Sequence, residues 1–518
     1  MKEWNEKTFF AGLQHKDPLL WSLDTDKEIS DRLGWLSLPE TMIEKCAAFE
    51  EFSRQVRAEN FEYIVLLGMG GSSLAPEVFQ KVLGNTSGFP RLVVCDTTHP
   101  DGILIVEKSV DLERTLFLIS SKSGTTLETL SLFHYFWKKI TRASKDPGTQ
   151  FAAITDPQTP LYFLAREQGF RYVFQAPSDV GGRFSALSDF GLVPAALTGV
   201  DIQSLLIRVK GYSEDAEDMV SGLRLGAVLG EFAKWRNKLT ILSTPLAAGF
   251  TYWLEQLIAE SLGKKGKGLI PILEEPVLPA DRYGADRSFV FLLSPEERNR
   301  KLLRLREHLK QEGHSVVSIN IHDRMDIGKE MFKWEVAVAA AGAVMGVHPF
   351  NQPDVQLTKE LTRKAMSRKR DTKNREDTSA GQWADAINRF CEQCSDGDYI
   401  ALQAFLPPEK KIKEILQEIR LRLLDKTGTA TTVGFGPRYL HSTGQLHKGG
   451  PNNGLFIQVV DIPHQDITVP EAGYSFGQLI AAQSYGDYSA LKQKGRRIIR
   501  VQIGEDTARG LEAILKRL

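Results

Sequence analysis

The stretch that decides the fold reads Tyr63-Ile-Val-Leu-Leu-Gly-Met-Gly-Gly-Ser-Ser73. Its apolar first half is typical of a short buried strand. The glycines that follow let the backbone turn sharply and approach a ligand closely. Helical periodicity begins at Leu74, and a helix N-terminus attracts anions through its free N–H groups and its dipole. The stretch therefore predicts a strand, a ligand-binding loop and a helix in succession.

Short apolar runs of the same kind recur along the chain, each followed by a helical pattern, which is typical of a doubly wound parallel sheet. In the first part they are 91–95, 115–119, 151–155 and 171–174, then 239–243, 288–293 and 315–321, and finally 399–403, 454–460 and 497–502. We predict an α/β fold with two doubly wound, three-layer αβα domains and a C-terminal α/β unit. The expected boundaries are 1–205, 206–372 and 373–518.

The third unit faintly repeats the second, because Leu309-Lys-Gln-Glu-Gly and Leu491-Lys-Gln-Lys-Gly both precede a predicted strand. A partial duplication is a hypothesis only, since every α/β domain repeats strand, helix and strand. Between the two units, residues 360–383 are strongly charged and polar, which predicts a solvated linker or helix face.

Composition excludes several classes of function. Lys+Arg and Asp+Glu both number 65, so the formal net charge is zero and gives no general attraction to nucleic acid or an anionic membrane. No apolar run reaches the roughly 18 residues of a membrane span, and the N-terminus lacks a secretory signal. The four cysteines include one CxxC without the second pair that a structural zinc needs. A cytoplasmic protein without metal is expected.

The first loop alone does not identify its ligand. It lacks the Gly-Lys-Ser/Thr ending of a Walker A loop, and it does not complete the glycine pattern of a dinucleotide site. Asp96, at the end of the next strand, resembles a ribose-binding acid, so a dinucleotide stays an alternative. Gly70, Gly71 and Ser72 are candidate phosphate ligands.

The second loop, Ser121-Lys-Ser-Gly-Thr-Thr-Leu-Glu-Thr129, places five hydroxyl side chains and one lysine within nine residues after another strand. Hydroxyl and backbone N–H groups together bind a phosphate monoester. An ordinary turn or helix cap is the alternative. The candidate phosphate ligands here are Ser121, Lys122, Ser123, Thr126 and Thr129.

These two loops resemble those of a sugar isomerase (SIS) domain. Asp179-Val-Gly-Gly-Arg-Phe-Ser185, Glu260-Ser-Leu-Gly-Lys264 and Pro349-Phe-Asn-Gln-Pro-Asp-Val-Gln-Leu-Thr-Lys359 resemble elements of the phosphoglucose isomerase family. The resemblance spans residues 61–359. It implies reversible isomerisation of glucose 6-phosphate and fructose 6-phosphate, in glycolysis and gluconeogenesis, without a cofactor. It also implies a homodimer whose active sites take a histidine from the neighbouring subunit.

Aldose–ketose isomerisation moves a proton between C2 and C1 through a cis-enediol, and it needs a base, a cation near the developing oxyanion and help in opening the sugar ring. By resemblance, Glu260 is the base and Arg183 stabilises the enediolate, since a guanidinium stays charged. Gly182 and Gln256 match substrate-contact positions. Gln352 matches a contact to the phosphate end, and Lys359 matches a group that assists at the ring oxygen and adjacent hydroxyls.

The ring-opening histidine departs from the family pattern, which places it some 20–30 residues after the glutamate. Residues 274–300 contain no histidine, whereas Leu440-His-Ser-Thr-Gly-Gln-Leu-His447 resembles the histidine segment of the bacterial enzymes. We predict that His441 supplies this group, from its own or a neighbouring subunit. A structural role for His441, with His348 as its substitute, is the alternative.

Other functions fit the same loops. Phosphate-binding loops do not read the C2 substituent, so mannose 6-phosphate or an amino sugar phosphate is an alternative substrate. A non-catalytic phosphosugar regulator is another, although it has no need of Glu260. The whole chain, with its C-terminal unit, also resembles the isomerase half of transaldolase–isomerase fusions. Without room for a barrel of about 250 residues, no transaldolase activity is expected.

Overall fold

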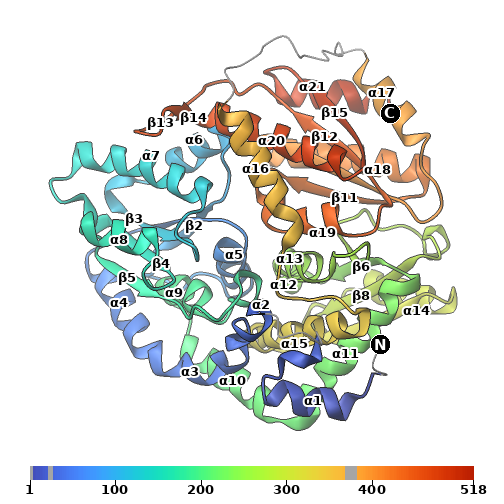
Figure 1. The fold of residues 1–518 in the computed structure, drawn as a ribbon, viewed down its shortest axis with the longest axis horizontal. Helices are drawn as coiled ribbons and strands as arrows, with labels where there is room; N and C mark the ends of the chain where they lie inside the picture. The colour runs from blue at the N-terminus through green and yellow to red at the C-terminus, as the bar shows by residue number, and fades with distance from the viewer. Residues whose placement is uncertain (1–3, 22–26, 368–381) are drawn as a thin grey trace.

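The computed structural model describes residues 4–21, 27–367 and 382–518. Figure 1 shows the first sheet and its helices, in blue to teal, on one side of the molecule and the later two units, in green to red, on the other, while the N-terminal helix Glu6–Gln14 lies beside the second unit. The predicted α/β fold with several parallel sheets is confirmed. Much of the predicted polar segment 360–383 lies outside the described residues, but its first part belongs to helix α16 (Gln356–Ser367).

The first sheet has the strand order β2-β1-β3-β4-β5, with all strands parallel. Its strands are β1 (Tyr63–Gly68), β2 (Arg91–Cys95), β3 (Thr115–Ser120), β4 (Phe151–Thr155) and β5 (Tyr172–Gln175). One face packs on α4 (Cys46–Ala58), α5 (Gly71–Leu83) and α9 (Asp189–Leu197), the other on α6 (Pro100–Lys108), α7 (Leu127–Ala143) and α8 (Pro160–Glu167). Alternate strand residues point to opposite faces, so Ile64 and Val65 lie in different hydrophobic clusters.

The second sheet has the order β7-β6-β8-β9. Its strands are β6 (Lys238–Ser243), β7 (Ile270–Leu273), β8 (Arg287–Leu293) and β9 (Ser315–Asn320), with helices α10 (Ile202–Glu214), α11 (Ala216–Trp235), α12 (Pro245–Ala248), α13 (Thr251–Leu262), α14 (Arg300–Gln311) and α15 (Ile327–Met345). Helices α11 and α15 pack so closely that a Cβ at Gly226 would overlap the carbonyl of Ala337, and the glycine permits this approach.

The third sheet has the order β11-β10-β12-β15. Its strands are β10 (Tyr399–Phe405), β11 (Ala430–Phe435), β12 (Gly454–Val460) and β15 (Arg497–Gln502), with helices α17 (Trp383–Cys391), α18 (Lys410–Thr427), α19 (Gly444–Gly449), α20 (Phe476–Gln493) and α21 (Thr507–Leu515). A small hairpin joins β13 (Thr468–Val469) to β14 (Tyr474–Ser475). In each sheet the second strand is an edge and the first lies next to it, so the shared order does not single out the later two units as duplicates.

Remaining short helices cover the N-terminal side and the connections. They are α1 (Glu6–Gln14), α2 (Lys27–Ser30) and α3 (Leu38–Thr41), and the 3-10 turns used below are η6 (Gly182–Phe184), η10 (Pro353–Val355) and η11 (Arg438–His441). Helix α16 packs on α20 of the third unit so tightly that a Cβ at Gly486 would overlap Thr362.

Two contacts between units decide where a site can form. The second and third sheets meet at their edge strands β7 and β11, where Ile272 of β7 shares a hydrophobic cluster with Ala430 of β11. The carboxyl ends of the first and third sheets face each other, because Asp461, directly after β12, bonds to His99 before α6 at 3.0 Å. Ligands of α/β folds bind outside the carboxyl ends of strands. The space between these two sheets is therefore the place to look for a site.

Candidate active site

A buried carboxylate and a buried guanidinium form the centre of the site. Glu260, on the last turn of α13, is 7% exposed, and Arg183 of η6 is 4% exposed. Arg183 Nη1 lies 3.1 Å from Glu260 Oε1, and Gln256, one helical turn earlier, donates to Glu260 Oε2 at 3.0 Å. Burial lowers the pKa of Arg183, while the charge of Glu260 opposes that shift. The structure thus brings together three of the predicted residues.

The remaining N–H groups of Arg183 fix its orientation. Its Nε donates to Ser261 Oγ at 2.8 Å, and its Nη2 donates to the carbonyls of Pro349 and Asn351 at 2.6 and 2.9 Å. These bonds also hold the segment that carries Gln352 against α13. A guanidinium fixed in this way cannot swing away when charge develops beside it, which is the requirement of electrostatic preorganisation.

The glycine loop lies directly against this centre. Gly70 has φ +58°, and a Cβ there would lie 2.9 Å from the carbonyl oxygen of His441 and 3.0 Å from Gln256 Nε2. A Cβ at Gly71 would overlap the carbonyl of Gly182. Only glycine allows so close an approach at a positive φ. The loop after β1 is thereby joined to α13, to η6 and to the third unit.

The hydroxyl loop after β3 lies at the neighbouring strand end. Ser121 and Thr126 share a hydrogen bond of 2.9 Å, and Ser123 is exposed. The Thr129 hydroxyl is buried and has no hydrogen-bond partner among the described residues. Lys122 is engaged elsewhere, because its Nζ pairs with Asp156 and donates to the Ser178 carbonyl at 3.0 Å.

His441 reaches this edge from the third unit of the same chain. Its Nε2 lies 3.0 Å from Glu128 Oε1 in the first turn of α7, and its carbonyl accepts from Gln256 at 2.8 Å. Gln483 of α20 donates to the same Glu128 oxygen at 2.7 Å. Burial raises the pKa of Glu128, but His441 and, more weakly, Lys359 outweigh burial and leave it lowered.

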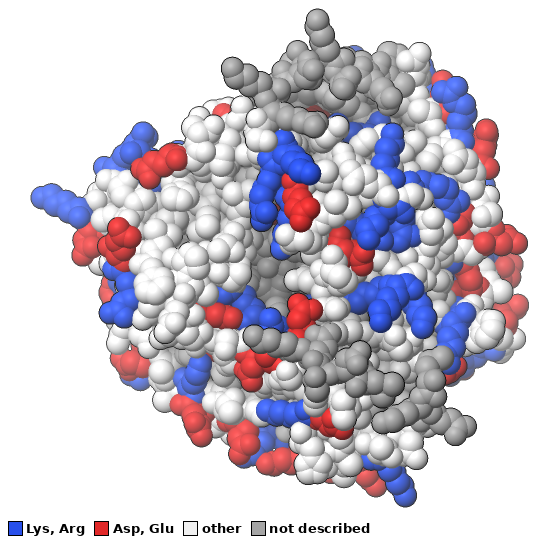
Figure 2. All heavy atoms as spheres, viewed as in Figure 1, with Lys and Arg blue, Asp and Glu red and all other residues white. Residues whose placement is uncertain are grey.

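Gln352 and Lys359 are exposed, one before η10 and the other on α16. Figure 2 shows a hollow on this face between the first unit and α13, with Lys and Arg side chains along α16 at its rim.

His348 does not share this set of contacts. Its Nδ1 accepts from Phe350 N at 3.0 Å, and it lines a cavity of about 370 Å³ with Lys264, Asn351 and other residues.

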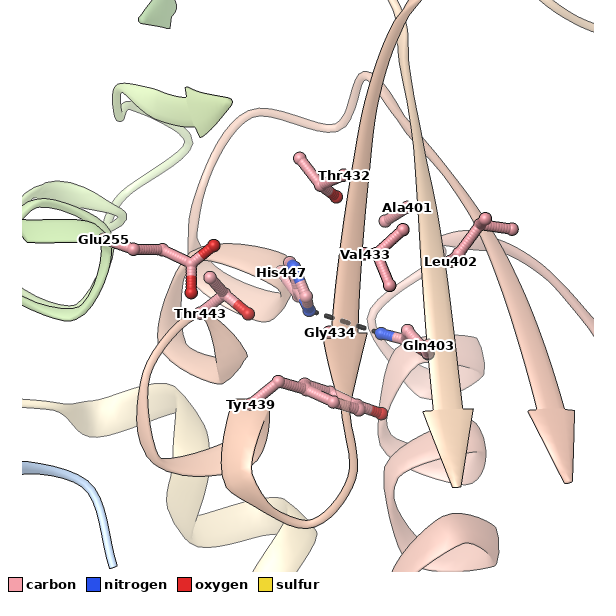
Figure 3. Close-up of a pocket in the computed structure, with 10 residues that line it drawn as sticks. All are labelled: Glu255, Ala401, Leu402, Gln403, Thr432, Val433, Gly434, Tyr439, Thr443 and His447. Atoms are coloured by element: carbon pink, nitrogen blue, oxygen red, sulfur yellow. Dashed lines mark hydrogen bonds between the residues drawn. The ribbon is translucent and has the colours of Figure 1, made fainter. Parts of the chain in front are cut away.

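A much smaller cavity of about 10 Å³ lies beneath the His441 segment, between α13 and the third sheet (Figure 3). Glu255 points into it from α13, toward Thr443 and His447. His447 Nδ1 lies 3.2 Å from Gln403 Nε2. Burial lowers the pKa of His447 well below its usual range and raises the pKa of Glu255 to about 7.

Sequence reasoning missed several partners of the site. Glu128 belongs to the hydroxyl loop quoted above. The sequence feature that could have identified it is an acidic residue in the first turn of the predicted helix. Arg438 and Gln483 carried no local signal. Asp96, considered above as a ribose ligand, pairs with Arg438 at 2.9 Å and accepts from Ser73 at 3.3 Å.

Within residues 4–21, 27–367 and 382–518, no three or more His, Cys, Asp or Glu side chains gather as metal ligands do. Over the same residues, every helix is too short or too polar to cross a bilayer.

Comparison with known proteins identifies relatives of the chain. Residues 42–211 match the model of the phosphoglucose isomerase family. Glucose-6-phosphate isomerase of Rubrobacter xylanophilus is 27% identical over 397 residues, which cover 66% of this chain and 90% of that protein. Glucose-6-phosphate isomerase of Carboxydothermus hydrogenoformans is 34% identical over 260 residues, 46% of this chain and 55% of the relative. The crystal structure of a glucose-6-phosphate isomerase from Chlamydia trachomatis shares the fold, with a TM-score of 0.52, 21% identity, and coverage of 68% of this chain and 77% of that one. The resemblance seen in the sequence motifs is confirmed.

Proposed function

We propose that this chain, whose relatives are glucose-6-phosphate isomerases, interconverts glucose 6-phosphate and fructose 6-phosphate by acid–base catalysis. It is an aldose–ketose isomerase. The observation that carries the proposal is the buried Glu260 beside Arg183, with the glycine loop after β1 touching Gln256 of the same helix. A base, a cation and a phosphate-binding strand end thus lie together.

Glu260 transfers the proton. Its carboxylate takes the proton from C2 of the open-chain aldose and returns it to C1, so that a cis-enediol forms and collapses to the ketose. Arg183 lies 3.1 Å from the carboxylate in the free protein, and its positive charge stabilises the oxygen that becomes negative during the transfer. Gln256 holds the second carboxylate oxygen and keeps the base oriented.

The phosphate binds at the carboxyl edge of the first sheet. Helices α5 and α7 begin directly after the two loops, so their N-terminal N–H groups face an anion there. The hydroxyls of Ser121, Thr126 and Thr129 add hydrogen bonds, and Gln352 and Lys359 close the site from the rim. Lys122, held by Asp156, contributes through its backbone and its charge.

His441 opens the sugar ring. Glu128 binds its Nε2, which leaves the other ring nitrogen to exchange a proton with the ring oxygen. A homodimer in the cytoplasm stays a prediction from the resemblance. The histidine that the family takes from a neighbouring subunit is supplied here by the chain's own third unit.

The test is a coupled assay in which the full-length protein converts fructose 6-phosphate to glucose 6-phosphate. Glu260→Gln keeps the shape of the side chain and removes the base, so turnover is expected to fall about 10³-fold, within the range of general-base catalysis. Glu255→Gln is the matched control, because it removes a carboxylate from the same helix that faces the small cavity instead. It should retain the parent's turnover.

Two results would contradict this function. A parent protein that binds fructose 6-phosphate without turnover would be a phosphosugar regulator. A parent that turns over mannose 6-phosphate faster than glucose 6-phosphate would be an isomerase of a related sugar, since the phosphate loops do not read C2.

A further inference from the structure

Besides the bond of His441 itself to Glu128, an arginine ties the His441 segment to the first unit. Arg438 begins η11, three residues before His441. Its Nη1 lies 2.9 Å from Asp96 Oδ2, and its Nη2 bonds to Glu77. Asp96 directly follows β2, and Glu77 lies on α5, the helix that starts at the glycine loop. One side chain therefore ties the histidine segment to two elements that flank the phosphate-binding edge.

The chemistry of this cluster requires a guanidinium. Two carboxylates close together repel each other unless a cation lies between them, and burial raises the pKa of Asp96. At Glu77 burial also acts to raise the pKa, but the charges of Arg438 and Lys81 outweigh it and lower the value to about 2. A planar guanidinium can donate to two carboxylates at once, whereas a lysine ammonium matches this geometry poorly.

A second anchor holds the same segment inside its own unit. The Tyr439 hydroxyl donates to Asp487 Oδ2 at 2.6 Å, and Lys448 pairs with Asp487 at 2.5 Å, with the two charged side chains almost fully buried. This anchor fixes the shape of the segment within the third unit. It also links the segment to α7 indirectly, since Gln483 of the same helix α20 donates to Glu128. The contacts of Arg438 cross directly to the first unit three residues from the imidazole, and they tie the segment to α5 and to the end of β2.

We propose that Arg438 is a positioning residue, which docks His441 of the third unit against Glu128 and the phosphate-binding edge within a single chain. The inference rests on the proposed function, since it assigns Arg438 a part in ring opening. Its neighbour Lys81 provides a matched control. Lys81 pairs with the same Glu77 at 2.7 Å from the solvent side, so its removal takes one partner from that carboxylate and leaves Arg438 in place.

The experiment compares two substrates of the full-length protein. Fructose 6-phosphate has to open its ring, whereas 5-deoxyfructose 6-phosphate lacks the hydroxyl that closes the ring and is always open. Deuterium exchange at C1, followed by NMR in D₂O, reports proton transfer on both. Arg438→Ala is expected to slow exchange on fructose 6-phosphate about 30-fold and on the open analogue less than threefold. Lys81→Ala should match the parent on both.

A double variant separates positioning from general damage. If Arg438 acts through His441, then Arg438→Ala combined with His441→Ala should be no slower than His441→Ala alone. Arg438→Lys, which keeps the charge, should recover part of the lost rate, and it serves as the test if the alanine variant does not fold.

Three results would overturn the inference: equal loss on both substrates, a double variant slower by the product of the single effects, or an Arg438→Ala protein as fast as the parent. A parent protein without exchange on either substrate would instead refute the proposed function itself.

Discussion

Two loops occupy the same topological position in neighbouring sheets but make different contacts. Residues 274–286 follow β7, and residues 436–453 follow β11, each the edge strand of a sheet with the same strand order. The first loop turns inward, where Leu278 and Tyr283 join a hydrophobic cluster with Leu424 of α18. The second carries His441 to the first sheet. The same position in the sheet is used for packing in one unit and, on the proposed function, for ring opening in the next.

The comparison explains the displaced histidine. The family pattern places it soon after the glutamate, which in this chain is the loop after β7, and that loop has no histidine. Strands β7 and β11 lie against each other at the junction of the two sheets, and Thr431 of β11 bonds to Glu275 of the loop after β7. The loop after β11 therefore starts near the loop after β7. On the proposed function, the loop after β11 supplies the histidine, about 180 residues after Glu260.

The largest effect that would break this comparison is expected from His441→Ala. If the loop after β11 supplies ring opening, turnover of fructose 6-phosphate should fall about 10²-fold, the lower end of acid–base contributions. Exchange on an open-chain substrate should fall much less. His348→Ala is the control, since that imidazole lines the other cavity. Equal losses on open and cyclic substrates would remove the chemical role from this loop.

Sequence patterns predicted most of the strands because buried parallel strands are continuous apolar runs. Besides the two-residue strands β13 and β14, they missed β7, which has only four residues and contains Pro271, and β11, where Thr431, Thr432 and Gly434 interrupt the apolar run. Strands β7 and β11 are the two edge strands that form the junction. The contact between the second and third sheets was consequently beyond the reach of sequence patterns.

The candidate site divides in the same way. Motif resemblance named Glu260, Arg183 and Gln256, which the structure brings into contact. The partners from other units, Arg438 and Gln483, had no motif, because their pairing depends on how units far apart in sequence dock. Lys122 was predicted as a phosphate ligand from residue type, and only the fold reveals its ion pair with Asp156.

The next effect concerns stability and the loop after β7. Glu275 is buried, pairs with Arg287 at 2.8 Å and accepts from the Thr431 N–H of β11 at 2.8 Å. Glu275→Gln would leave Arg287 buried without its ion-pair partner and would remove one counter-charge of Arg420, whose pKa burial already lowers to about 10. The free energy of unfolding in urea should fall by about 3 kcal/mol.

The matched control is Glu274→Gln, because this neighbouring carboxylate is exposed and its loss should cost no more than about 0.5 kcal/mol. Turnover of the folded Glu275→Gln protein should stay within about twofold of the parent. A large loss of turnover at full folding would show that the loop after β7 also serves the chemistry, and the contrast between the two loops would then fail.

The smallest expected effect is a pH dependence of stability that concerns the loop after β11, which Glu255 faces (Figure 3). Burial raises its pKa to about 7, although the charges of Arg438 and Arg420 oppose the shift. The folded protein therefore binds a proton here that an unfolded glutamate, with a pKa of about 4.3, has released. The stabilisation from this group is complete below about pH 4 and is lost as pH rises through 7.

Glutamine resembles the protonated acid, so Glu255→Gln should remove this part of the pH dependence. Between pH 5 and pH 8 the parent should lose about 1–3 kcal/mol of unfolding free energy relative to the variant. Urea unfolding at several pH values measures the difference. Parallel pH profiles for parent and variant would mean that Glu255 is charged and hydrated in the folded protein. The interface between the His441 segment and α13 would then be hydrated, and ion pairs rather than packing against α13 would hold the segment in place.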